Sequence, residues 1–105
     1  MSESISIANL NEALASQNPP IVFDVRKKPA FESDSRTIQN AEWRSFDDVK
    51  TWAVDIAKDA QIVVYCVHGH EVSQSAARSL RELGLNATYL EGGIATWIEE
   101  GNSVS

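Results

Sequence analysis

The sequence predicts an α/β protein whose central sheet is mainly parallel and is flanked by helices on both faces. Three observations predict this class: short apolar runs at residues 21–25, 61–65 and 87–90, amphipathic helical patterns between those runs, and Gly and Pro residues that fall between the periodic segments. Apolar runs without polar alternation are typical of strands buried on both faces. Strands that alternate with helices favour parallel pairing through right-handed crossovers.

The first elements expected along the chain are a short helix and a buried strand. A helix is expected over residues 9–17, because Asn9 and Glu12 have the spacing of a capping box. The apolar run 21–25 then predicts a strand, in which Asp24 is the one polar residue.

The middle of the chain is expected to hold short elements and one amphipathic helix. Segment 30–36 is typical of a short helix or an irregular loop, and a brief strand is expected at Ile38. Ser45, followed three residues later by Asp48, has the spacing of a helix cap. Apolar residues then recur at helical spacing over residues 49–56, which predicts one buried helical face.

The second half alternates strands and helices more clearly. Residues 61–65 form the second buried strand signal, and residues 73–83 form a helical pattern that Gly84 is placed to end. A further strand is expected over residues 87–90, before a terminal helix over residues 94–100. This alternation completes the predicted parallel sheet.

Length and charge exclude several classes of function. The 105 residues are the size of one domain, so a single domain is expected over residues 1–105. With 9 basic and 15 acidic side chains the net charge is −6, which disfavours nucleic acid as a partner. No apolar run reaches the roughly 20 residues that span a bilayer, and Met1–Leu10 does not resemble a secretory signal. We therefore expect a cytoplasmic protein with no membrane partner.

The single cysteine, Cys66, stands at the junction of a predicted strand and a predicted helix. A loop that enters a helix at the carboxyl edge of a parallel sheet directs backbone N–H groups and the positive end of the helix dipole to its centre. Such a setting favours the thiolate, which is the nucleophilic form of cysteine. Gly69 suits a tight loop of this kind. A lone cysteine after an apolar strand is by itself more often a core residue, but the glycine loop and the following helix favour a reactive thiol.

Four motifs resemble those of the rhodanese-like domain family, in the family's order. The segment around the cysteine resembles the family's active-site loop and helix, and the others resemble its Asp-Val-Arg signature, its Ile-x-Gly-Ala segment with Asn40 in place of Gly, and its terminal Gly-Gly-x-x-x-Trp element. In chain order they are Phe23-Asp24-Val25-Arg26, Ile38-Gln39-Asn40-Ala41, Cys66-Val67-His68-Gly69-His70-Glu71-Val72-Ser73-Gln74-Ser75-Ala76-Ala77 and Leu90-Glu91-Gly92-Gly93-Ile94-Ala95-Thr96-Trp97.

The resemblance implies a single-domain sulfurtransferase. The thiolate of Cys66 takes a sulfane sulfur from thiosulfate or another small donor, becomes a persulfide, and passes the outer sulfur to cyanide or a thiol. Neither a metal nor an organic cofactor is required, and a monomer is expected. Backbone N–H groups would hold the negative terminal sulfur as an oxyanion hole holds oxygen. They belong to Val67, His68, Gly69, His70, Glu71, Val72 and Ser73.

Two features of the loop depart from the family pattern. Many sulfurtransferases have a six-residue loop with a basic side chain, whereas the loop 66–72 has seven residues and contains Glu71 but no Arg or Lys. Thiosulfate is therefore not assured as the physiological donor. Seven residues is the loop length of the rhodanese-fold dual-specificity phosphatases, but these need an Arg at the position of Val72 to clamp the oxyanion. Phosphatase activity is not expected.

The remaining candidate residues have structural interpretations. Cys66, His68 and His70 form a Cys-x-His-x-His cluster, but three ligands in five residues of a tight loop rarely converge on a metal, so solvated histidines are expected. Asp24 and Arg26 are expected to form an ion pair that pins adjacent loops near the site. The three tryptophans are expected in the core, and a solvated turn is expected at two adjacent lysines; these residues are Trp43, Trp52, Trp97, Lys27 and Lys28.

Two other functions stay open beside the enzyme. A non-catalytic rhodanese-like binding or sensing module would use the unusual loop as a docking surface. A redox or metal sensor would use the Cys-x-His-x-His loop. The cysteine at the catalytic place favours the enzyme, because an inactive domain has no need to keep a thiol there.

Overall fold

The computed structural model describes residues 3–105, which contain a five-stranded sheet with every neighbouring pair of strands parallel. The strand order is β1-β5-β4-β2-β3. The strands are β1 (Ser4–Ile5), β2 (Ile21–Asp24), β3 (Glu42–Trp43), β4 (Gln61–Tyr65) and β5 (Asn86–Leu90). The predicted α/β class is confirmed.

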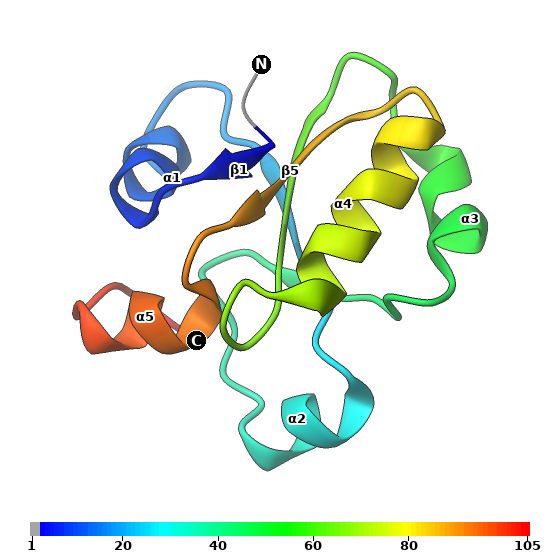
Figure 1. Ribbon diagram of the computed structural model, residues 1–105. Coiled ribbons are helices and arrows are strands. Elements are labelled where there is room, and N and C mark those ends of the chain that lie inside the picture. The colour runs from blue at the N-terminus through cyan, green and yellow to red at the C-terminus, as the bar shows by residue number, and fades with distance from the viewer. Residues whose placement is uncertain (1–2) are drawn as a thin grey trace.

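Helices cover both faces of this sheet. They are α1 (Ile7–Leu14), α2 (Lys28–Ser33), α3 (Val49–Trp52), α4 (Glu71–Glu82) and α5 (Gly93–Glu99), with a 3₁₀ turn at Ala53–Asp55. Helices α1 and α5 lie on one face and α3 and α4 on the other, while α2 lies beyond one edge (Figure 1). None of the helices within residues 3–105 is long and apolar enough to cross a membrane.

The central strand β4 contributes side chains to the two hydrophobic clusters that lie on the two faces of the sheet. Ile62 and Val64 pack in the cluster beneath α3 and α4, whereas Val63 and Tyr65 pack in the cluster beneath α1 and α5. All four side chains are buried. A strand with both faces covered has no reason to alternate with polar residues, which is why this segment is a continuous apolar run.

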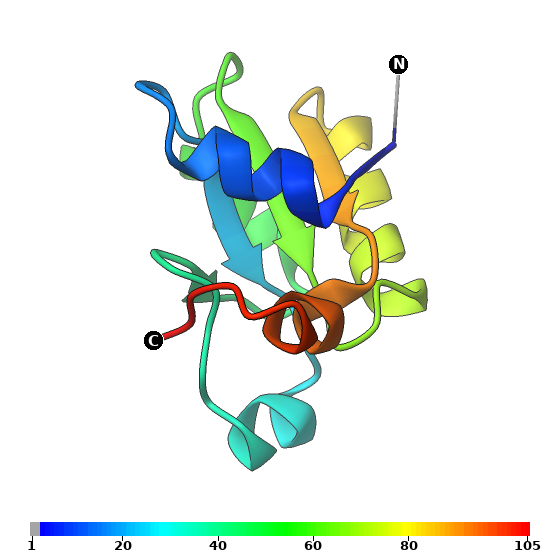
Figure 2. The ribbon, with the colours of Figure 1, turned by 90° about the vertical axis from the view of Figure 1, so that its left-hand side faces the viewer.

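The carboxyl ends of the strands meet at one edge of the sheet (Figure 2). Because β4 lies between β2 and β5, the segments that follow these three strands are neighbours at that edge. The segment after β4 contains the single cysteine, Cys66, and the segments after β2 and β5 lead into α2 and α5. Ligands of open parallel sheets bind at such an edge.

The helix expected over residues 9–17 begins and ends earlier than predicted. It spans Ile7–Leu14, because the hydroxyl of Ser6 accepts the N–H of Asn9 at 3.1 Å and so caps the helix. Asn9 is therefore inside the helix instead of at its cap, and the helix begins two residues earlier than expected, at the buried Ile7.

Two other expectations in the middle of the chain were wrong in detail. The helix α3 is a single turn capped at Asp48, and the Ser45 hydroxyl instead donates to the Asp47 carboxylate. No ladder forms at Ile38, which makes one isolated antiparallel bridge to Val104. The strand in this region comes later, at Glu42–Trp43, where the chain reaches the edge of β2.

Candidate active site

Cys66 directly follows the central strand and is largely buried, with 6% of its surface exposed. Its thiol donates a hydrogen bond to the hydroxyl of Ser73, with 3.1 Å between Sγ and Oγ. Ser73 is fully buried in the first turn of α4, and its hydroxyl has the carbonyl of His70 at 3.5 Å as acceptor. When the thiol loses its proton, the Ser73 hydroxyl is in place to donate to the sulfur instead.

Helix α5 sets the orientation of the loop that starts at Cys66. The carbonyls of Cys66 and Val67 accept the N–H groups of Ile94 and Ala95, each at 3.0 Å. In a trans peptide the N–H points opposite to the C=O, so the N–H groups of Val67 and His68 point away from α5. The amino end of α5 thus holds the two loop carbonyls and leaves the following amides free for a ligand.

The rest of the loop continues this row of amide donors. Over the part of the chain that the structure describes, no backbone hydrogen bond uses the amide N–H groups of residues 67–73. The last three of them open α4, whose amino end carries the positive end of the helix dipole. Backbone N–H groups that are left without an acceptor in a loop at a helix start are donors that an anion can use.

Two glycines allow the loop to approach the turn before α5. Gly69 has φ +74°, and a Cβ on it would lie 2.8 Å from both the Gly92 nitrogen and the Leu90 carbonyl oxygen. Gly93 has φ +64°, and a Cβ on it would collide with the carbonyls of Cys66 and Val67. Larger side chains at either position would push the loop off its support.

A cavity of about 300 Å³ opens above the thiol. It is lined by Arg26, Lys27, Ala30, Cys66, Val67, His68, His70, Glu71 and Val72. Of the predicted site residues, three contribute no lining, although two of them, Gly69 and Ser73, support the loop and the sulfur. The third, Asp24, is buried beneath the site.

The helix after the loop starts two residues before the predicted Ser73, at Glu71. Glu71 and Val72 therefore belong to the first turn of α4 and not to an irregular loop. The exposed carboxylate of Glu71 is compatible with the positive helix end, while Val72 is half-buried against the core beneath α3 and α4.

Lys27 and Ala30 also line the cavity, although neither was expected at the site. Lys27 is exposed, as expected for a solvated turn, but it also stands at the mouth of the cavity. The strand order could have predicted their place. In a parallel sheet, the segment that follows one central strand lies beside the segment that follows the neighbouring strand. Pairing of β2 with β4 cannot be established from a lone sequence, so this signal was missed.

The expected ion pair between Asp24 and Arg26 is present and fully buried. The guanidinium donates to both carboxylate oxygens, with Nη2–Oδ2 at 2.6 Å and Nε–Oδ1 at 3.0 Å. It also donates to the carbonyls of Asp34 and Arg36, at 2.8 and 2.9 Å. The pair therefore ties the segment after α2 to the floor of the sheet beside the cavity.

Tyr65 completes this buried cluster. Its hydroxyl donates to the Asp24 carboxylate at 3.2 Å and accepts the N–H of Ile38 at 3.1 Å. Burial, and next the negative charge of Asp24, raise the pKa of Tyr65 far above its ordinary value.

His68 and His70 are both exposed at the rim of the cavity, with ring centroids 6.2 Å apart. Within residues 3–105, no group of three or more His, Cys, Asp and Glu side chains is arranged to hold a metal ion.

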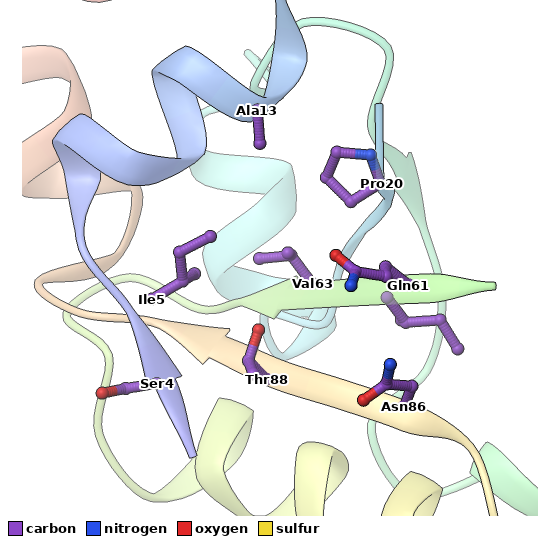
Figure 3. A pocket seen from close by; sticks show the side chains of 9 residues that line it. Ser4, Ile5, Ala13, Pro20, Gln61, Val63, Asn86 and Thr88 are labelled. Atoms are coloured by element: carbon purple, nitrogen blue, oxygen red, sulfur yellow. The ribbon is translucent and has the colours of Figure 1, made fainter. Parts of the chain in front are cut away.

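A second cavity, of about 240 Å³, lies between α1 and the amino-terminal half of the sheet, away from the thiol (Figure 3). Ser4, Ile5, Ala13, Pro20, Gln61, Ile62, Val63, Asn86 and Thr88 line it. This lining contains no titratable or nucleophilic side chain other than the hydroxyls of Ser4 and Thr88. The one thiol of the chain, Cys66, lies at the opposite edge of the sheet.

Known proteins resemble this chain in sequence. The sequence profile of the rhodanese-like domain matches residues 6–100. The thiosulfate sulfurtransferase GlpE of Coxiella burnetii is 35% identical over 78 residues, which cover 73% of this chain and 70% of that protein.

Solved structures are similar over nearly the whole chain. A rhodanese-related protein from Thermoplasma volcanium has 34% sequence identity and a TM-score of 0.82, over 99% of this chain and 98% of that one. A rhodanese-like domain protein from Staphylococcus aureus has 25% identity and a TM-score of 0.81, over 99% of both chains. The sequence, the fold and the relatives agree, and the chain belongs to the rhodanese-like domain family.

Proposed function

We propose that the protein is a sulfurtransferase that works through a persulfide on Cys66. The observation that carries the proposal is that its one thiol lines an open cavity and is followed by a loop, residues 67–73, whose amides have no backbone acceptor. The name of the relative GlpE, thiosulfate sulfurtransferase, supports the same reaction class.

The reaction is a pair of displacements at sulfur. The Cys66 thiolate attacks the outer sulfur of thiosulfate, the bond between Sγ and that sulfur forms, and sulfite leaves with the electron pair of the broken S–S bond. A thiolate or cyanide then attacks the outer sulfur of the persulfide and regenerates the Cys66 thiolate. The total charge is conserved in both steps, and no oxidant or reductant is consumed.

The loop stabilises negative charge in each intermediate. The terminal sulfur of the persulfide is anionic, and the N–H groups of residues 67–73, which have no backbone acceptor, are the donors available to it. Ser73 Oγ, at 3.1 Å from Sγ, donates to the inner sulfur once the thiolate has formed. Donors held in place before the reaction stabilise such charge without reorganisation.

Intact-mass measurement tests the proposal. After incubation with thiosulfate, the protein is expected to gain the mass of one sulfur atom and to lose it again on addition of cyanide. Cys66→Ser is expected to gain nothing, and Ser73→Ala to gain sulfur more slowly. Retention of the adduct in Cys66→Ser, or no adduct in the wild type with any sulfane donor, contradicts the proposal.

A further inference from the structure

The cavity above Cys66 carries opposite charges on walls that come from different elements. Lys27 lies in the connection between β2 and α2, whereas Glu71 is the first residue of α4. The other cation of the lining, Arg26, is neutralised by its buried pair with Asp24. In the described part of the chain Lys27 forms no ion pair, so its charge is available to a ligand.

We propose that Lys27 binds the anionic end of the sulfur donor and that, together with Glu71, it selects donors with a single negative charge. This inference rests on the proposed sulfur transfer and adds the substrate class. It assigns to Lys27 the cationic function that the loop itself lacks.

The ammonium group of Lys27 contacts one aromatic ring beside the cavity. Its Nζ lies 5.8 Å from the centroid of the Phe46 ring, which is half-buried against the core beneath α3 and α4. A cation over an aromatic face at this distance is attracted by the ring. The neighbouring Lys28 is equally exposed but belongs to α2 and does not line the cavity.

The preference for one charge follows from how each energy scales. Attraction to Lys27 grows in proportion to the charge of the donor, but the cost of removing an ion from water grows with the square of its charge. A second negative charge also meets Glu71, which stands on the other wall. One cation therefore compensates a monoanion better than it compensates a dianion such as thiosulfate.

The rest of the lining favours an organic donor. Ala30, Val67 and Val72 give the cavity apolar walls, and its volume of about 300 Å³ is at the lower end of sites for small organic molecules. An alkyl thiosulfonate combines one negative charge with an apolar group. In its reaction the bond between Cys66 Sγ and the terminal sulfur forms, the S–S bond of the donor breaks, and the sulfinate leaves with the electron pair. No proton moves and no oxidant is needed.

Alkylation of Cys66 tests Lys27 without reference to sulfur transfer. The chain has one cysteine, so iodoacetate, which is an anion, and iodoacetamide, which is neutral, react with the same sulfur. Both reagents need the thiolate, so a change in the fraction of thiolate alters both rates equally and leaves their ratio unchanged. Lys27→Gln is expected to lower the iodoacetate-to-iodoacetamide ratio about threefold, the size of an exposed charge interaction. Lys27→Arg should retain the wild-type ratio, and Lys28→Gln, which changes the net charge equally, should also retain it. An unchanged ratio in Lys27→Gln, or an equal fall in Lys28→Gln, overturns the assignment.

Steady-state kinetics with methanethiosulfonate and thiosulfate then test the selectivity. The wild type is expected to have the larger kcat/KM for methanethiosulfonate. Lys27→Gln should raise KM for both donors with kcat changed less than about twofold, because an exposed charge acts on binding. Glu71→Gln should raise kcat/KM for thiosulfate more than it raises kcat/KM for methanethiosulfonate. Equal kcat/KM values for the two donors in the wild type overturn the selectivity. The two proposals can also fail separately. If neither donor forms a persulfide but Lys27→Gln still lowers the alkylation ratio, the proposed function is overturned and Lys27 remains an anion-binding residue.

Discussion

Asp24 is the one polar residue in an otherwise apolar strand, and its surroundings explain why it is tolerated. The carboxylate is fully buried, yet it accepts hydrogen bonds from the Arg26 guanidinium, the Arg26 backbone N–H and the Tyr65 hydroxyl. Removing one partner of a buried pair leaves an uncompensated charge and costs roughly 3–5 kcal/mol. These residues thus stabilise the position of the segments around the site.

Tyr65 gives this cluster a measurable signature at high pH. An unfolded tyrosine ionises near pH about 10, whereas burial and the charge of Asp24 hold the pKa of Tyr65 far above that value. The contribution of Tyr65 to stability is therefore complete below pH about 10 and is lost as the pH rises further. In Tyr89→Phe, which leaves Tyr65 as the one tyrosine, tyrosinate absorbance is expected to appear together with loss of the far-UV circular dichroism signal. Ionisation near pH about 10 with the fold intact would contradict this expectation.

At the scale of elements, α5 matters to the site as much as α4 does. The terminal Gly-Gly-x-x-x-Trp motif predicts a turn and a docked helix, and Trp97 is indeed buried in the core beneath α1 and α5. The structure adds that the amides of Ile94 and Ala95 hold the carbonyls of the Cys66 loop. The motif therefore determines where the free amides of the site point.

Gly93→Ala is expected to damage both the fold and the site. The added Cβ meets the loop carbonyls at a positive φ, and we expect a loss of roughly 2–4 kcal/mol in the free energy of unfolding. Gly101→Ala is the matched control, because Gly101 has φ +82° with no atom within 4 Å of the added Cβ. It should cost about 1–2 kcal/mol, the strain of the backbone alone. Urea unfolding measures both free energies of unfolding. Equal losses in the two variants would contradict the prediction, because they would show that the loop moves aside without further cost.

The sequence predicted elements well where burial alone decides them. The strand expected over residues 61–65 has those bounds in β4, where the four residues after Gln61 are apolar and buried on both faces. Helix ends were predicted less well, since Ser6 rather than Asn9 caps α1 and α4 begins at Glu71. Among the site residues, the segment around Cys66 was visible because it is contiguous. Lys27 was not assigned to the site, because it reaches the cavity through strand pairing that is distant in sequence.

At the scale of the whole molecule, the net charge acts on any anionic donor. The chain carries −6, and its greatest extent is 33 Å. The Debye length is roughly 30 Å at 0.01 M ionic strength and about 8 Å at 0.15 M. At low salt nearly every charge of the molecule therefore contributes to the electrostatic potential at the cavity. Near physiological salt, that potential comes mainly from the charges that line the cavity.

Salt should therefore separate the global field from the local charges. For the wild type, KM for thiosulfate is expected to fall as the ionic strength rises from about 0.01 to about 0.15 M, because repulsion by the net charge is screened. Glu71→Gln is expected to lower KM about two- to threefold at the lower ionic strength. Glu82→Gln, on the last residue of α4, is the control of equal charge. An unchanged KM in Glu71→Gln at low salt would refute the local effect and leave loop shape to decide the donor.

The pairing of β1 with β5 also bears on when the candidate site can form during synthesis. Ser4 and Ile5 pair with Tyr89 and Leu90, so the sheet is incomplete until most of the chain has left the ribosome. Contacts between such distant segments form late in folding. The carbonyls of the Cys66 loop find their partners later still, at Ile94 and Ala95. The loop that contains the thiol therefore lacks this support until the last strand and the helix after it have been translated.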